Sequence, residues 1–135
     1  MKDVYICSAR EDRALTAWLT EALEKRGFSC FKVPADLDPT RGYRQQITEA
    51  IASCLGFVVL SSAASRGDAS VLNEVEHSLA IGREALSFEV DPVPIEPFGC
   101  LLFGKNTHRY AAYRDREQAA EELAAHLRAQ KEKRG

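Results

Sequence analysis

The chain has 135 residues, of which 45% are hydrophobic and 28% charged, with a net charge of -2 at pH 7. This size and composition are typical of one globular domain, and the balanced charge argues against a nucleic-acid partner. The longest apolar run, Cys54 to Leu60, is far shorter than the roughly 20 residues of a membrane-spanning helix. The apolar residues after Met1 are interrupted at once by Asp3, so no signal peptide is expected. We therefore predict a cytoplasmic protein that binds neither nucleic acid nor a membrane.

The four cysteines are widely spaced in the sequence. They are Cys7, Cys30, Cys54 and Cys100, with no C-x-x-C pair and no accompanying histidine pattern. Zinc sites of the common kind need such spacing, so no metal site is expected. Free thiols in or beside apolar runs pack as small hydrophobic side chains. We predict that all four cysteines are reduced thiols.

Five apolar segments with β-branched or aromatic residues are predicted to be strands. In chain order they are Val4 to Cys7, Phe28 to Val33, Phe57 to Leu60, Ala85 to Val90 and Cys100 to Phe103. The fourth contains Ser87 and Glu89, and three prolines between residues 91 and 99 prevent a long regular element before the fifth.

Segments with helical periodicity separate these strands. The first helix is predicted from Leu15 to Leu23 and ends before Gly27, a typical helix stop. Further apolar faces begin at Tyr43 and at Val71, and a last helix runs from about Arg114 to Gln130.

The alternation of strands and helices predicts an α/β fold. Specifically, we expect a flavodoxin-like three-layer sandwich with a five-stranded, mostly parallel sheet, the first strand central, and helices on both faces. The domain is expected to span residues 1–130. Residues 131–135 would form a basic tail, either the solvated end of the last helix or a linker.

Ligands of such sheets bind beyond the carboxyl ends of the strands. We therefore expect the functional residues in the three loops at that edge, which are Ser8 to Asp12, Pro34 to Gly42 and Ser61 to Ser70. They contain no G-x-G-x-x-G dinucleotide turn, no P-loop and no G-x-S-x-G nucleophile elbow. A phospho-accepting receiver domain is also excluded, because the third strand ends in serines where that class has an aspartate.

Polar side chains gather at this edge, and each has an ordinary structural explanation. Ser8 and Glu11 match a capping box, and aspartates such as Asp36 are common in turns. Glu74, predicted in the first turn of a helix, would complement the helix dipole. These residues alone leave structural and functional roles open.

Four segments of the chain match one known pattern in the expected order. V-Y-I-C-S-A-R-E-D begins at Val4, P-A-D-L-D-P-T-R-G-Y begins at Pro34, and L-G-F-V-V-L-S-S and S-V-L-N-E-V-E lie between Leu55 and Glu76. They resemble the first strand and loop, the BB loop, the third strand and the E-[IV] helix of Toll/interleukin receptor (TIR) domains. The chain departs from the usual family residues at Ser8, Thr40, Ser70 and Ser87.

The resemblance implies a function. It implies an NAD+ glycohydrolase that releases nicotinamide and ADP-ribose or a cyclic ADP-ribose, with NAD+ as substrate and no bound cofactor or metal. Glu74 would be the catalytic carboxylate. Substrate-binding positions would be Ser8, Arg10, Asp36, Tyr43 and Ser70. Activity would require self-association with other TIR domains through the Pro34 to Gly42 loop, as in bacterial anti-phage defence.

The chemistry of NAD+ is compatible with a single carboxylate. Its nicotinamide is a pyridinium, so cleavage releases a neutral leaving group and needs no general acid. The transition state needs relief of the positive charge on the ribose, which Glu74 would supply. Arg10 would pair with the diphosphate, and backbone donors of the Pro34 to Gly42 loop would hold the adenosine end. Glu76 is about 200° around the helix from Glu74 and would serve no part of this site.

Two other functions stay open at this stage. A non-catalytic TIR adaptor would use the exposed loop for assembly and would have no use for an isolated carboxylate at the sheet edge. A flavodoxin-like binding module of another family would bind flavin and give a yellow preparation.

Overall fold

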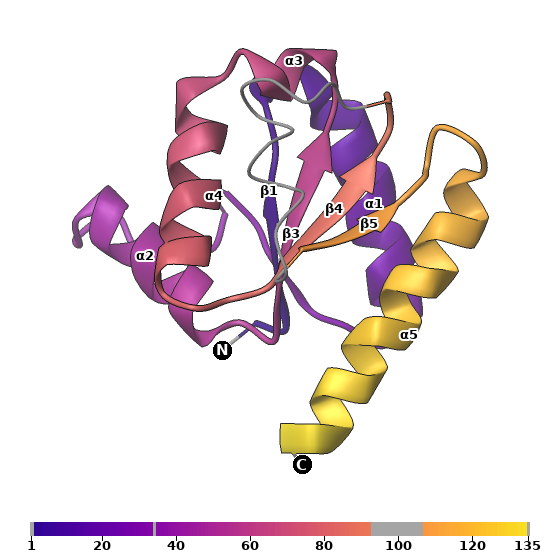
Figure 1. Cartoon of the computed structure of the whole chain (residues 1–135). Coiled ribbons are helices and arrows are strands. Elements are labelled where there is room, and N and C mark those ends of the chain that lie inside the picture. The colour runs from indigo at the N-terminus through magenta and orange to yellow at the C-terminus, as the bar shows by residue number, and fades with distance from the viewer. Residues whose placement is uncertain (1, 34, 93–106, 135) are drawn as a thin grey trace.

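The computed structural model describes residues 2–33, 35–92 and 107–134 (Figure 1). The strands are β1 (Val4–Cys7), β2 (Cys30–Phe31), β3 (Gly56–Ser61), β4 (Ala85–Glu89) and β5 (Thr107–Tyr110). The helices are α1 (Arg13–Lys25), α2 (Tyr43–Ser53), α3 (Ala63–Arg66), α4 (Ala69–Ala80) and α5 (Arg116–Arg134), and a short 3-10 turn, η1, covers Arg10–Asp12.

The strands form one sheet in the order β2-β1-β3-β4-β5, and all four pairings are parallel. This confirms the predicted α/β class. The prediction that the first strand is central is wrong by one position, because β3 occupies the middle. The chain runs outward from β1 to β2, crosses back to β3 and continues in the opposite direction. This reversal between β1 and β3 opens a crevice at their carboxyl ends, where ligands bind in such sheets.

Both faces of the sheet are covered by helices (Figure 1). Because side chains alternate along a strand, Val4 and Val58 face the layer of α1 and α5, whereas Tyr5 and Phe57 face the layer of α2 and α4. All four side chains are at most 4% exposed. The double cover explains why β1 and β3 have apolar residues on both faces.

The first predicted helix ends as expected. Gly27 follows α1 with a φ of 92°, a left-handed conformation that favours glycine. The backbone N–H groups of Gly27 and Phe28 donate to the carbonyls of Glu24 and Leu23, at 3.1 Å each. These bonds satisfy carbonyls at the helix end. Because Phe28 takes part in them, it is not in a strand, although the predicted second strand begins there.

Two predicted strands differ from the structure. β2 is only two residues long and pairs with β1 alone, so it is shorter than Phe28 to Val33. The predicted strand Cys100 to Phe103 lies outside the described residues. The fifth strand of the described sheet is β5, in which only Tyr110 is buried, so no apolar run marked it in the sequence.

The last helix is longer than predicted. α5 continues to Arg134, so residues 131–134 form the end of that helix, which was one of the two alternatives for the basic tail. Cys7, Cys30 and Cys54 are buried free thiols, as predicted, and Cys100 lies outside the described residues. Within the described ranges, no helix combines the length and apolar character needed to cross a membrane.

Candidate functional site

A cleft of about 880 Å³ lies beyond the carboxyl ends of β1 and β2, beside the start of α4. Its walls come from the residues that follow β1, from α1, from the end of β2 and from α4. The cleft brings together five of the six predicted site residues, namely Ser8, Arg10, Tyr43, Ser70 and Glu74. It opens on the β2 side of the crevice that the reversal in strand order creates, because β1 lines it but no residue of β3 does.

Glu74 is half-buried in this cleft, and its Oε1 accepts a hydrogen bond from the Tyr5 hydroxyl at 2.8 Å. The prediction of a first-turn glutamate is wrong, because α4 begins at Ala69 and Glu74 lies in the second turn. Asp68 instead caps the helix, and its Oδ1 accepts from the backbone N–H groups of Ser70 and Val71 at 2.9 and 3.1 Å. Helix capping therefore does not account for Glu74.

The surroundings of Glu74 disfavour its ionised form. Burial raises the pKa of the Glu74 carboxyl, and the nearby Asp68 adds to this effect. Hydrogen bonds from Tyr5 and Cys7 partly oppose it. Burial and the adjacent Glu74 in turn raise the pKa of the Tyr5 hydroxyl, so Tyr5 stays a neutral donor. The site holds a carboxylate that is poorly solvated yet oriented by a fixed donor.

We expect this arrangement to lower the stability of the fold at neutral pH. A carboxyl with a raised pKa binds its proton more tightly when folded, so the free energy of unfolding falls as the pH rises above the ordinary value of about 4.3. Glu74→Gln should therefore be as stable as the wild type or more stable at about pH 7, by up to about 2 kcal/mol. Its advantage should shrink at about pH 4, where wild-type Glu74 is largely protonated. Urea unfolding of both proteins at the two pH values measures this, and a variant less stable at pH 7 would contradict it.

Tyr5 is a site residue that the sequence analysis missed. Its ring packs between two aromatic side chains, with centroids 5.7 Å from Phe31 and 6.0 Å from Phe57, the latter in a stacked arrangement. This packing fixes the direction of the hydroxyl toward Glu74. The available signal was a tyrosine in an otherwise apolar buried strand, since a buried hydroxyl usually has a partner.

Ser8 does not cap a helix as predicted. η1 begins after Ala9 without a side-chain cap, and the Ser8 Oγ accepts a hydrogen bond from the Thr16 hydroxyl at 2.8 Å. Ser8 and Thr16 thus line the cleft wall as a bonded pair between the end of β1 and α1.

Both basic and acidic side chains line the same cleft, the acidic ones being Glu21, Glu24, Asp68 and Glu74. Arg10 and Arg13 are exposed, line it, and form no ion pair with any other described residue. Lys32 also lines it but pairs with Glu24 at 3.0 Å. Arg10 and Arg13 are therefore available to an anionic ligand.

Asp36 does not reach the cleft. It borders a separate hollow of about 450 Å³ near the loop between β2 and α2. The Asp36 Oδ2 accepts from the backbone N–H of Lys32 at 2.8 Å, which is the turn role that the sequence also allowed. The buried Gln46 anchors this loop, since its side chain bonds both the N–H and the carbonyl of Asp38 at 2.7 and 2.8 Å.

Two apolar side chains lie exposed at the rim of the cleft. Val33 is 48% exposed where β2 leads into the loop, and Tyr43 is 60% exposed at the start of α2. Both side chains also line the cleft, so they are accessible to a molecule bound there.

The fold and this site define a flavodoxin-like α/β domain with an oriented carboxylate in a cleft at the carboxyl end of its first strand. The family model of the TIR domain matches residues 4–127. The chain therefore belongs to the TIR domain family.

Solved structures agree with this assignment. The TIR domain of the Toll-related receptor TRR-2 from Hydra magnipapillata aligns with a TM-score of 0.77 and 21% identity over 95% of this chain and 99% of that one. The TIR domains of the activated Roq1 resistosome, which recognises the pathogen effector XopQ, align with a TM-score of 0.58 and 21% identity over 68% of this chain and 60% of that one.

A flavodoxin-like domain from Synechococcus sp. is also similar, with a TM-score of 0.62 and 19% identity over 94% of this chain and 99% of that one. At such identities the structural likeness shows the fold alone, so it is no evidence that this chain binds flavin. The comparison with curated proteins gave no significant match.

Proposed function

We propose that this TIR domain cleaves NAD+ at its nicotinamide–ribose bond, with Glu74 as the catalytic carboxylate. The observation that carries the proposal is the half-buried Glu74 carboxylate, oriented by the Tyr5 hydroxyl at 2.8 Å inside a cleft of about 880 Å³. An adaptor that works by surface contacts alone needs no such group in a cleft. The test is nicotinamide release by concentrated or artificially clustered protein, compared with Glu74→Gln.

The proposed reaction places positive charge where the site has negative charge. As the bond to nicotinamide breaks, its electron pair leaves with the neutral nicotinamide and the ribose becomes cationic. Glu74 stabilises that cation in a poorly solvated site, where a fixed charge acts more strongly than in water. Water, or an atom of the substrate itself, then bonds to the cationic ribose and gives up its proton to solvent, which yields ADP-ribose or a cyclic product. The electron and proton balance of this step requires no oxidant or reductant.

The rest of the substrate is proposed to lie along the cleft. Arg10 and Arg13 would bind the diphosphate, since guanidinium groups form strong charge-assisted bonds with phosphate oxygens. Tyr43 and Ser70 line the same cleft and would contact the nucleoside parts. Asp36 borders the other hollow, so it is given no contact with the substrate in this proposal.

We propose that self-association controls this activity, with the loop of residues 35–42 at the contact. The exposed Val33 and Tyr43 beside the loop support a contact surface there. The similarity to the TIR domains of a resistosome supports assembly as a mode of action. A role in anti-phage defence is a further hypothesis, tested by phage plating on cells that express the wild type or Glu74→Gln.

Turnover per molecule should rise with protein concentration if assembly completes the site. We expect an increase of about tenfold or more between dilute protein and protein clustered on a scaffold, because ordering a site can contribute several kcal/mol to the rate. Initial rates over a wide concentration range, with crosslinking of the same samples, measure this. Constant turnover with monomer alone at every concentration would contradict it.

A further inference from the structure

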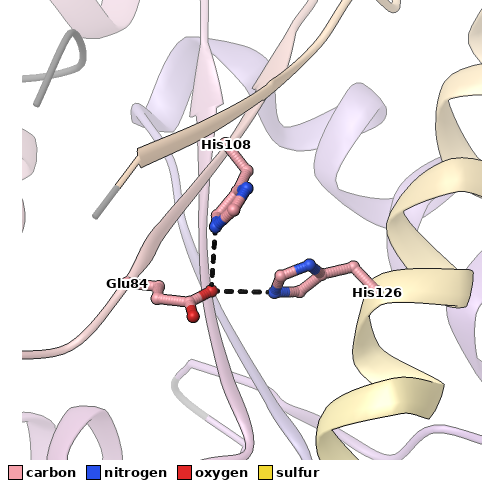
Figure 2. A group of neighbouring side chains, drawn as sticks. All are labelled: Glu84, His108 and His126. Atoms are coloured by element: carbon pink, nitrogen blue, oxygen red, sulfur yellow. Dashed lines mark hydrogen bonds and ion pairs between the residues drawn. The ribbon is translucent and has the colours of Figure 1, made fainter. Parts of the chain in front are cut away.

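Three side chains distant in sequence meet near the amino ends of β4 and β5 (Figure 2). The Glu74 cleft lies at the other end of the sheet, where the parallel strands end. Glu84 immediately precedes β4, His108 lies in β5 and His126 lies in α5. Both imidazoles direct their Nε2 atoms at the same carboxylate oxygen, since His108 and His126 lie 3.2 and 2.8 Å from the Glu84 Oε2. None of these residues lines the cleft that holds Glu74.

We propose that Glu84, His108 and His126 bind a zinc ion. Two imidazoles and one carboxylate are a common ligand set for zinc with one open position. The three ligand atoms lie within 4.8 Å of one another. Ligand atoms of a tetrahedral zinc ion with bonds of 2.0–2.1 Å are about 3.3 Å apart, so only small side-chain rotations would form the site. Nitrogen donors favour zinc over magnesium or calcium.

The fold holds the three ligands in place before any ion binds. The pairing of Leu86 with His108 fixes β5 against β4 just beyond Glu84. The fully buried Leu123 and Leu127 hold α5 on the sheet on either side of His126. Rigid elements of this kind preorganise a metal site because little conformational freedom is lost on binding.

Neighbouring groups complete the environment of the site. The Gln130 side chain donates to the Glu84 Oε1 at 3.5 Å, which leaves Oε2 directed at the two histidines. Such outer contacts orient ligating carboxylates. A small hollow of about 180 Å³, bordered by Glu84, His126 and Gln130, leaves room for a water molecule as the fourth ligand.

The sequence predicts no metal site, because its cysteines and histidines lack the close spacing of common zinc sites. The ligands here come from two strand regions and the last helix, and only the folded chain brings them together. A zinc ion would tie α5 to β4 and β5, so the expected consequence of binding is a more stable fold. This inference is independent of the proposed NAD+ cleavage.

Zinc chloride and cobalt chloride, each titrated into the whole chain at pH 7.5, test the proposal. We expect saturable binding of one ion, a rise in the thermal midpoint with zinc, and visible cobalt bands of a four-coordinate site without a thiolate charge-transfer band. His108→Ala, His126→Ala and Glu84→Gln should each weaken binding by tenfold or more, since ligand loss exceeds the effect of outer-contact loss. His77→Gln is the control, because it removes the remaining histidine of the chain.

The outcomes separate a metal site from a hydrogen-bonded cluster. Unchanged affinity in the double variant His108→Ala/His126→Ala, a cobalt–thiolate band, or no saturable binding would each overturn the proposal. Circular dichroism of each variant checks that lost binding does not reflect lost folding. His108 lies on the edge strand and is partly exposed, so its replacement is the variant least able to disturb the fold.

Discussion

Glu74→Gln should reduce nicotinamide release by on the order of a hundredfold or more while the fold stays intact. Glutamine keeps the shape of the side chain and can still accept the hydrogen bond from Tyr5, so the geometry of the site is retained. What is lost is the negative charge that stabilises the cationic ribose. If Glu74 had only a structural role, its neutralisation would relieve a poorly solvated charge and leave turnover unchanged. The catalytic role therefore predicts a large loss of turnover, whereas a purely structural role predicts none.

Two variants make this measurement specific. Glu76→Gln removes the same charge from the same helix, but Glu76 is exposed and lies outside the cleft, so wild-type turnover is expected. Tyr5→Phe keeps the Glu74 carboxylate and removes only its hydrogen-bond donor, so an intermediate loss of about tenfold is expected, from one charge-assisted bond. Wild-type turnover in Glu74→Gln under clustering conditions would remove the catalytic assignment and favour assembly without catalysis.

Much of the fold follows from local patterns. β1 and β3 are apolar on both faces because helices cover both, and that feature together with the alternation of strands and helices predicts a parallel sheet buried within a sandwich. The end of the first helix could also be predicted from Gly27, because the left-handed conformation that ends many helices favours glycine. The two short edge strands could not be predicted from the sequence pattern. β5 has one buried residue of four, and β2 gains its two paired residues only from contact with β1.

The site was partly predictable for a similar reason. Strand ends and loops can be located from the pattern, so Ser8, Arg10 and Glu74 were correctly assigned to one edge. Hydrogen bonds between residues that are distant in the sequence cannot be predicted from the local sequence pattern. The Tyr5 hydroxyl meets Glu74 across 69 positions, and Ser87, which stands where the family usually has proline, bonds the Ser61 hydroxyl at 2.7 Å inside the sheet. Such pairs depend on the register of β1, β3 and β4, which the sequence alone does not fix.

Phe57→Ala should destabilise the fold far more than any of the site substitutions, by about 3 to 5 kcal/mol. Phe57 is fully buried in the central strand, and its ring stacks on Tyr5 at 6.0 Å. Truncation removes that apolar contact and leaves a cavity that surrounding strands cannot close, because β1 and β4 are both hydrogen-bonded to β3. The thermal midpoint should fall by about 10 to 20 °C for a chain of this size.

Ile81→Ala is the matched control for that loss, since it truncates an aliphatic side chain that is 44% exposed just after α4. We expect it to cost less than about 1 kcal/mol, because much of its surface is already in water. Thermal and urea unfolding of both variants measure the difference, and equal losses would contradict the burial argument. Phe57 also supports the ring that orients Glu74. If Phe57→Ala remains folded at low temperature, its turnover should therefore fall toward that of Tyr5→Phe, although Phe57 itself lines no part of the cleft.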